Sequence, residues 1–213
     1  MFTGIVQKTV SIISTRNTGG LRCVHIKTPA RWRLSSGQSV AVDGICSTVA
    51  RKGNGFFEVE YVHETLMKTT AGKFIKGKKV NLERSLKYGG FIDGHFVQGH
   101  VDTRGRVVAI VERGKAKEYV VSLPRALMPF IVRKGSVAVN GVSLTVARRG
   151  EASFTIALIP HTLASTNLVS LNIGDEVNIE TDMLARYAVA VVGVSGTVIP
   201  HAKKRARQKI HRR

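Results

Sequence analysis

Two short segments of the sequence place a cysteine or a serine two residues before a threonine. Cys46 precedes Thr48, and Ser143 precedes Thr145. Residues i and i+2 of a β-strand point to the same face, so each segment would present a thiol or hydroxyl beside a threonine hydroxyl. No sequence neighbour would activate Cys46 as a thiolate. On spacing alone, a small core residue followed by a strand-forming threonine is the favoured interpretation.

Histidines offer a second kind of chemistry. His95 and His100 lie in the segment GHFVQGH, and a histidine in such a glycine-flanked connection could carry protons near neutral pH. Their spacing is poor for a metal and nothing supplies further ligands, so no metal site is expected. The sequence also lacks GxxxxGK followed by Ser or Thr, GxGxxG after a strand, and GxSxG. It therefore gives no support to ordinary nucleotide-dependent enzymes.

The sequence repeats itself at an offset of 97 residues. Residues 39–49 (SVAVDGICSTV) and 136–146 (SVAVNGVSLTV) are identical at seven of eleven positions. The same offset continues as far as Glu83 and Glu180. A register kept over this span indicates a duplicated domain rather than a solenoid. The cysteine and serine described above are then equivalent positions of two homologous halves.

Each half is predicted to consist mainly of short strands. The Asp43–Gly44 and Asn140–Gly141 pairs lie between alternating apolar runs and indicate hairpins. With little helical periodicity, the pattern predicts a mainly β fold of two duplicated small antiparallel barrels of Greek-key type. One helix is expected after Asp182, an acceptable N-cap, as far as Gly193. Its nearly all-apolar surface needs burial, and we expect copies of the same helix in an oligomer to cover it. The predicted division is an N-terminal barrel (1–96), a C-terminal barrel (97–184), an oligomerisation helix and linker (185–200) and a disordered basic tail (201–213).

The charge is positive throughout the sequence. There are 33 Lys and Arg against 14 Asp and Glu, seven of the basic residues lie in 201–213, and residues 1–200 keep a net charge of +12. Nucleic acid is nevertheless not expected as a partner, because aromatic residues make up only 6% of the chain and none are interleaved with the charges. Two cysteines form no disulfide framework, and no targeting segment or membrane span is evident. A cytoplasmic protein without membrane partners is the expectation.

Several motifs in their order resemble those of riboflavin synthase of the α-subunit type. They are MFTGIV, the repeated pair, HETLMKTT, IPHTLASTN, GHFVQGHVD and VNIETD before the final helix. The resemblance covers about residues 1–192 and excludes the basic tail. It implies a transferase of riboflavin biosynthesis that uses no metal or organic cofactor. One 6,7-dimethyl-8-ribityllumazine donates a four-carbon unit to another, which gives riboflavin and 5-amino-6-(D-ribitylamino)uracil.

The same resemblance implies an assembly. Each barrel would bind one lumazine, and a homotrimer would form through the C-terminal helix. The active site would lie between the N-terminal barrel of one subunit and the C-terminal barrel of another. Lumazine synthase is a further partner that the resemblance suggests.

Site residues also follow from the matched motifs. The resemblance implies that Cys46, Ser143, His100 and Asp182 line the chemistry, with Ser143 or a water adding to the acceptor ring, His100 moving protons and Asp182 orienting or deprotonating. The substrate-binding residues expected around the first pocket are Gly4, Ile5, Val6, Cys46, Ser47, Thr48, Glu60, Tyr61, Val62, His63, Glu64 and Thr65. Those expected around the second are Gly99, His100, Val101, Lys134, Ser143, Leu144, Thr145, Ala157, Leu158, Ile159, Pro160, His161 and Thr162.

The sequence departs from the family pattern in a few places. Ser47 stands where the family usually has Leu, Thr70 where it has Asn, His161 where it has Glu, and Asp93 where it has Gly. Two alternatives to the enzyme stay open. One is a non-catalytic lumazine- or flavin-binding relative, such as the antenna proteins of luminous bacteria. The other is a basic barrel protein that binds nucleic acid.

Overall fold

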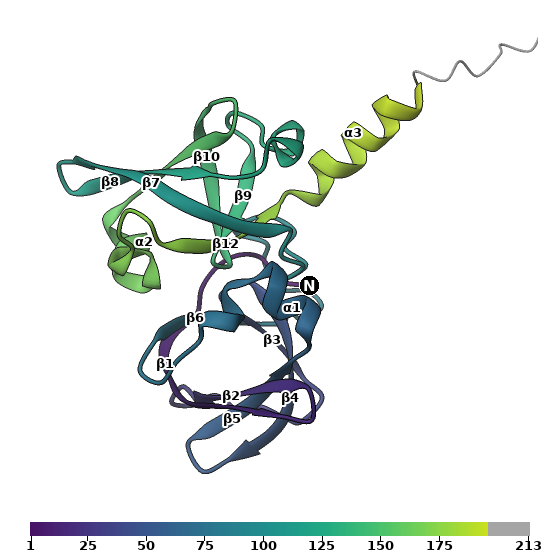
Figure 1. Cartoon of the computed structure of the whole chain (residues 1–213), viewed down its shortest axis with the longest axis vertical. Coiled ribbons are helices and arrows are strands. Elements are labelled where there is room, and N and C mark those ends of the chain that lie inside the picture. The colour runs from purple at the N-terminus through teal and green to yellow at the C-terminus, as the bar shows by residue number, and fades with distance from the viewer. Residues whose placement is uncertain (196–213) are drawn as a thin grey trace, which may run out of the picture.

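The chain forms two closed barrels of six antiparallel strands, one above the other in Figure 1. The structure is a computed structural model and describes residues 1–195; the predicted tail at 201–213 lies outside the described residues. The first barrel consists of β1 (Lys8–Thr18), β2 (Leu21–Lys27), β3 (Ser39–Val42), β4 (Ile45–Gly53), β5 (Phe56–Tyr61) and β6 (Lys79–Arg84). The second consists of β7 (Thr103–Arg113), β8 (Ala116–Ser122), β9 (Ser136–Val139), β10 (Val142–Arg149), β11 (Ser153–Leu158) and β12 (Glu176–Thr181).

Short helices connect the strands. They are α1 (His63–Lys68) and η1 (Thr70–Lys73) in the first barrel, and η2 (Arg125–Phe130), α2 (Pro160–Ser165) and η3 (Asn167–Ser170) in the second. The helices α1 and η1 correspond to α2 and η3, whereas η2 has no counterpart in the first barrel within residues 1–195. The longer α3 (Met183–Ser195) follows the last strand. The predicted mainly β fold, with two duplicated barrels and a C-terminal helix, is confirmed.

The hairpins predicted from the repeat close each barrel at equivalent points. β3 pairs with β4 through Val42 and Ile45, and both turn residues between them, Asp43 and Gly44, have positive φ angles of 48° and 77°. Positive φ at both turn residues matches the twist of the flanking strands, and Asp-Gly favours that turn. Further along, β4 leaves β3 and pairs with β5 across a register shift after Val49. A bulge of this kind lets one strand turn the corner of a closed barrel.

The two barrels meet at these turns. A side chain at Gly44 would lie 2.7 Å from the backbone nitrogen of Gly141, so only glycine permits the approach. Buried amides surround the contact. Asn167 donates from Nδ2 to Asp43 Oδ1 at 2.9 Å, and its backbone N–H donates to Asn81 Oδ1 at 2.8 Å. Because these hydrogen bonds join residues of different halves, the joint is polar and specific rather than a sliding apolar surface.

A pair of hydroxyls distinguishes the core of the first barrel from that of the second. Ser47 Oγ donates to the Ile45 carbonyl at 2.9 Å, and the Tyr61 hydroxyl lies 2.9 Å from the same Oγ. Both side chains are at most 3% exposed. The repeat places Leu144 and Leu158 at the equivalent positions of the second barrel, where both are buried. The first barrel thus replaces two core leucines by a hydrogen-bonded Ser–Tyr pair.

We expect Ser47 and Tyr61 to be strongly coupled in the stability of the protein. Ser47→Leu leaves the Tyr61 hydroxyl buried without its partner, and Tyr61→Leu leaves a cavity beside Ser47. The double variant restores the leucine pair that the second barrel already uses. Its free energy of unfolding, measured with denaturant, should exceed the value expected from adding the two single effects by about 1–3 kcal/mol. Additive single effects would show that the hydroxyl contact contributes nothing.

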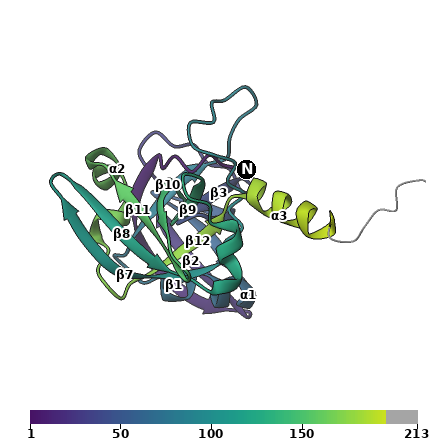
Figure 2. The same ribbon diagram turned by 90° about the horizontal axis from the view of Figure 1, so that it is seen from above.

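Helix α3 leaves the second barrel and extends away from both barrels (Figure 2). It begins after Asp182, whose Oδ1 accepts a hydrogen bond from the backbone N–H of Leu184 at 2.9 Å. Arg186 anchors its first turn by an ion pair with Asp102. Large apolar side chains along it are exposed, including Tyr187 at 64% and Val192 at 72%. No helix within residues 1–195 has the length and apolar character needed to cross a membrane.

Candidate functional site

Two short segments cross between the barrels and pack against strands of the other half. We call residues 2–6 the N-terminal arm and residues 97–101 the connecting arm. The Gly4 carbonyl of the N-terminal arm accepts a hydrogen bond from the Ser143 N–H at 2.7 Å. The Gly99 carbonyl of the connecting arm accepts one from the Cys46 N–H at 2.8 Å. The N-terminal arm of the first half therefore packs on the second barrel, at Ser143. The connecting arm, which leads into the second half, packs on the first barrel, at the equivalent residue Cys46.

Glycine is required at both crossing points. Gly4 and Gly99 have φ angles of 77° and 80°. An added Cβ would lie 2.6 Å from Ser143 Cβ in one case and 2.7 Å from Cys46 Cβ in the other. Any side chain would push the arm away from the strand that it completes.

A buried glutamate holds each arm in place. Glu83 on β6 accepts hydrogen bonds from the backbone N–H of Thr3 at 2.7 Å and of Gly4 at 3.0 Å. Glu180 on β12 does the same for Gln98 at 2.6 Å and Gly99 at 2.9 Å. Burial raises the pKa of both carboxyls, although these hydrogen bonds act in the opposite direction. The arms are thus fixed from one side by their own half and from the other side by the opposite half.

The first site is a cavity of about 260 Å³ where the connecting arm meets β4 and α1. Cys46, half-buried on the outer face of β4, lines it together with His100 and Val101 of the arm. Glu64 and Thr65 of α1 complete its mouth. The cavity therefore combines a thiol, an imidazole, a hydroxyl and a carboxylate around a small apolar wall, which suits a ring with several polar substituents.

At the second site, Ser143 is paired with a histidine. His95 Nδ1 lies 2.7 Å from Ser143 Oγ. Burial lowers the pKa of His95, and the nearby Asp182 carboxylate opposes the shift. The neutral ring can therefore accept the serine proton at neutral pH. His95 Nε2 is buried and has no hydrogen-bond partner among the described residues, so it is left for a group from outside the chain.

The structure brings several predicted site residues to these two places, with one exchange. The sequence grouped Gly4, Ile5 and Val6 with Cys46, and Gly99, His100 and Val101 with Ser143. The opposite pairing is observed, because each arm crosses to the other barrel. Consistently, Val6 packs against the core of the second barrel and Val101 against that of the first. This grouping was wrong because equal sequence motifs do not reveal which half an arm crosses to.

Four predicted binding residues turn their side chains into the barrel cores. They are Ser47, Tyr61, Leu144 and Leu158, all at most 9% exposed. Only their backbone borders the sites. Their neighbours on the same strands point outward and stay available, namely Thr48, Glu60, Thr145 and Ala157. The residues that open α1 and α2 are exposed as well: Val62, His63, Glu64, Ile159, Pro160 and His161.

Two further predicted residues, Lys134 and Asp182, lie in a turn and at the start of a helix. Lys134 is exposed and has a φ of 68°, while its backbone N–H donates to the Val146 carbonyl at 2.8 Å. The equivalent position of the first barrel is Gly37, with φ 84°. A left-handed turn therefore carries a lysine in the second barrel where the first barrel has a glycine. Asp182, half-buried, lies close enough to His95 to influence its charge while it caps α3.

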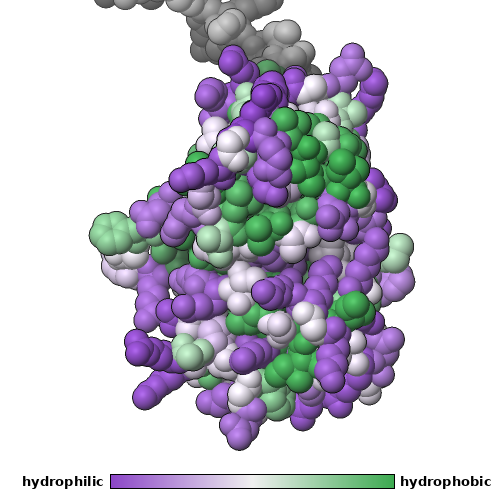
Figure 3. Space-filling model, turned by 90° about the vertical axis from the view of Figure 1, so that its left-hand side faces the viewer, coloured by the Kyte–Doolittle hydropathy of each residue, from purple (hydrophilic) through white to green (hydrophobic). Residues whose placement is uncertain are grey.

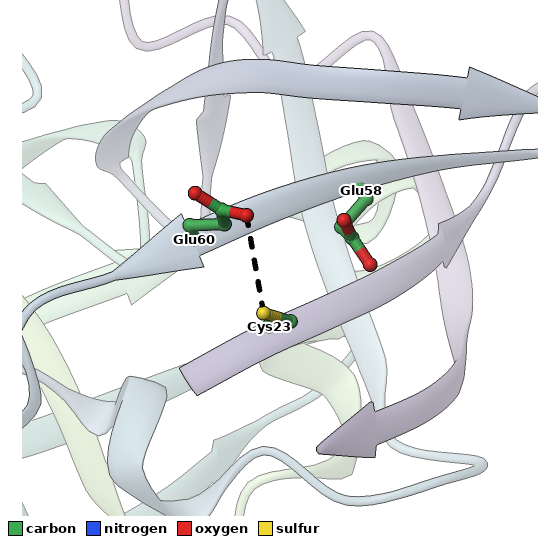
Figure 4. Close-up of side chains that lie close together, drawn as sticks. All are labelled: Cys23, Glu58 and Glu60. Carbon is green, nitrogen blue, oxygen red and sulfur yellow. Dashed lines mark hydrogen bonds between the residues drawn. The ribbon is translucent and has the colours of Figure 1, made fainter. Parts of the chain in front are cut away.

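One group of metal-binding side-chain types occurs within residues 1–195. The ligand atoms of Cys23, Glu58 and Glu60 lie within 4.8 Å of one another on the outer wall of the first barrel (Figure 4). Glu58 is already engaged, since Arg51 donates to it at 2.8 Å and 3.2 Å and His25 contacts it closely. Burial would raise the pKa of Glu58, but these hydrogen bonds outweigh it and hold the pKa below its usual value. The group is an ion-pair cluster, and we assign it no metal.

His95 is the residue that the resemblance did not carry over as catalytic. The sequence offered both histidines of GHFVQGH as proton carriers, and the resemblance favoured His100. In the structure they serve different sites, His100 beside Cys46 and His95 beside Ser143. The sequence did hold one signal for this assignment, since His95 and His100 lie at the two ends of the segment that crosses between the barrels.

Comparison with known proteins agrees with this architecture. The lumazine binding domain matches residues 3–85 and 98–182. Riboflavin synthase of Bacillus subtilis (strain 168) is 40% identical over 188 residues, which cover 88% of this chain and 87% of that protein. Riboflavin synthase of Brucella abortus (strain 2308) is 40% identical over 195 residues, covering 88% and 96%. The solved structure of LumP complexed with riboflavin has a TM-score of 0.79 at 24% identity, covers 85% of this chain and 99% of that one, and shows the shared fold. With two such domains and relatives at this identity over most of its length, the chain belongs to the riboflavin synthase family.

Proposed function

We propose that the chain dismutates two molecules of 6,7-dimethyl-8-ribityllumazine to riboflavin and 5-amino-6-(D-ribitylamino)uracil. The observation that carries this proposal is the presence of two equivalent, arm-completed sites that differ in their reactive side chains, Cys46 and Ser143. Two identical substrates require two similar pockets, and their unequal roles require that the pockets differ. Binding both rings in a fixed orientation supplies much of the rate.

The second site suits the lumazine that accepts the four-carbon unit. The ring of this substrate must be attacked by a nucleophile. Ser143 Oγ can add to it while His95 Nδ1, at 2.7 Å, takes the serine proton. Proton transfer by a positioned histidine contributes typically about 10²–10⁴-fold to a rate.

The first site suits the lumazine that gives up the unit. Its ring methyl must lose a proton, and His100 lines the same cavity as Cys46. Glu64 stands at the mouth, where a carboxylate can accept hydrogen bonds from ribityl hydroxyls. Lys68 fixes it by an ion pair at 2.7 Å. In the second barrel His161 and Ser165 take these two positions, so the two ribityl chains meet different partners.

We further propose a homotrimer assembled through α3. Its exposed Leu184, Tyr187 and Val192 would be covered by copies of the same helix. A catalytic centre would then form where the first site of one subunit faces the second site of another. The cytoplasm is the expected compartment, because both cysteines are free and stay reduced there. Association with lumazine synthase remains a prediction.

Turnover by the purified full-length protein tests the proposal. With a chelator and no added metal, we expect chromatography to show one riboflavin formed for every two lumazines consumed. Titration by lumazine fluorescence should show two ligands bound per chain. The variant Cys46→Ser/Ser143→Ala should keep most of the binding and lose most of the turnover. Tight binding without any riboflavin would instead identify a non-catalytic lumazine-binding protein.

A further inference from the structure

A second cavity, of about 510 Å³, lies between the end of β6, the linker after it and the N-terminal arm, and neither Cys46 nor Ser143 lines it. Three cationic side chains line it: Arg33, Arg84 and Lys87. None of the three has a carboxylate partner within the described part of the chain. A cluster of cations without acidic partners at a cavity attracts an anion electrostatically.

Arg84 is held in a fixed position for such a role. Its guanidinium lies over the Trp32 ring, 5.0 Å from the centroid, and its Nε donates to Gln7 Oε1 at 3.3 Å. The two terminal nitrogens make no hydrogen bond or ion pair within the described residues and remain free to donate in parallel. A guanidinium anchored in this way loses little conformational entropy on binding and matches the paired oxygens of a phosphate or carboxylate.

Two acidic residues also line the cavity, and they affect it differently. Both carboxylate oxygens of Glu83 already accept hydrogen bonds from Thr3 and Gly4 of the N-terminal arm. Asp93 is exposed in the linker and faces the same cavity. One free acid against three cations leaves the cavity positive.

The second barrel has an acidic residue at the position equivalent to Gln7. There, the backbone N–H of Thr181 donates to Asp102 as that of Arg84 does to Gln7. Asp102 forms an ion pair with Arg186 of α3 in the same chain. In the first barrel the neutral Gln7 takes the place of this acid and Arg84 takes the place of Thr181, so a cation stands here without the carboxylate found in the second barrel.

We propose that this cavity binds a small phosphate monoester, with the phosphate between Arg84, Arg33 and Lys87. The ester group would lie against the exposed Phe91 and Ile5, which line the same cavity. Ile5 follows Gly4, whose carbonyl holds Ser143. A ligand here therefore contacts the arm that completes the second site. The assignment stands independently of the reaction proposed above.

Calorimetric titration of the full-length protein with phenyl phosphate and with inorganic phosphate tests the site. Phenyl phosphate should bind more tightly, because its ring adds the contact with Phe91. Arg84→Gln should weaken phenyl phosphate binding about tenfold or more, as expected for loss of a charge-assisted hydrogen-bond pair. Arg125→Gln removes the same charge from an exposed arginine of the second barrel and should leave the affinity unchanged.

Two further variants keep the test decisive. Arg33→Gln/Lys87→Gln alters only exposed side chains, so weaker binding in this variant supports the site even where Arg84→Gln perturbs the fold. Asp93→Asn should tighten binding. Equal losses in Arg84→Gln and Arg125→Gln, or no binding by the unmodified protein at physiological salt, would refute the proposal and leave only a general basic surface.

Discussion

Replacing His95 by glutamine is expected to lower turnover by about two orders of magnitude or more. Glutamine can keep a hydrogen bond to Ser143 but cannot take its proton. His95 Nδ1 lies 2.7 Å from Ser143 Oγ, and burial lowers the pKa of the imidazole. The neutral, proton-accepting form therefore predominates at pH 7, and activity should fall only as the pH drops below the usual histidine range. Steady-state rates from pH 5 to 8 would measure both effects.

A merely structural role for His95 would give a different pattern. If His95 acts through Ser143, the variant His95→Gln/Ser143→Ala should be no slower than Ser143→Ala alone, since residues that act as a unit are not additive. The acidic limb of the pH profile should also disappear in His95→Gln. Multiplicative losses in the double variant, with an unchanged pH profile, would contradict the pairing.

The sequence predicted the barrels because their clearest signals are local. The turns at Asp43–Gly44 and Asn140–Gly141 need positive φ at two successive residues, and few residue pairs provide it. The repeat then supplied the second barrel from the first. Strands β1 and β7 were not singled out, since their outer ends are polar and exposed and weaken the alternating pattern. Helices α1 and α2, at six residues each, are too short for a helical period to appear.

The geometry of the sites could not be read in the same way. The motif around Gly4 and the motif around Gly99 each look like the start of a half. The decisive contacts are backbone hydrogen bonds to Ser143 and Cys46, which leave no pattern in side-chain type. The burial of Ser47 was hidden for a similar reason: it follows Cys46 directly, and only the pleat of β4 sends its side chain inward.

The charge was a poor guide to function for a physical reason. Many of the basic residues are exposed around the barrel walls, where several pair with acids. Arg51 meets Glu58, Arg148 meets Glu118, and Arg104 meets Glu176. The face in Figure 3 is correspondingly hydrophilic over most of its area, with apolar areas between. Such pairs contribute little stability each and say little about partners. Arg33, Arg84 and Lys87 differ from these pairs in that they line one cavity and have no acidic partner within residues 1–195.

The joint between the barrels should become more stable at alkaline pH when Asp43 is replaced by asparagine. Asp43 is 1% exposed, and burial raises the pKa of its carboxyl to about 7, against the Asn81 N–H, the charge of Lys78 and the Asn167 amide. The folded protein thus holds this proton more tightly than the unfolded chain. Well below pH 4 both states are protonated, and the carboxyl costs no stability. As the pH rises to about 7, the unfolded chain ionises first and the folded state loses stability.

The expected size of this effect is large. A difference of about three units between the folded and unfolded pKa corresponds to roughly 4 kcal/mol once both states are ionised. Asparagine carries no charge and fits, because the repeat already places Asn140 in the equivalent turn, where its Oδ1 accepts from the Asn178 N–H at 2.8 Å. In Asp43→Asn the acceptor for the Asn81 N–H and the Asn167 amide is retained. Its thermal midpoint should exceed that of the unmodified protein by about 5 °C or more at pH 8 and by much less at pH 5.

The opposite exchange supplies the control. Asn140→Asp introduces a second buried carboxyl beside the first, so it should lower the thermal midpoint at pH 8 far more than at pH 5. Combined with Asp43→Asn, it moves the single carboxyl to the other barrel and should return the pH dependence of the unmodified protein. An identical midpoint-against-pH curve for the unmodified protein and Asp43→Asn would show that the carboxyl does not titrate in the folded joint. The surroundings of the two turns do differ: Asn167 Nδ2 donates to Asp43 at 2.9 Å, whereas Thr70, which the repeat aligns with Asn167, donates its backbone N–H to Asn178.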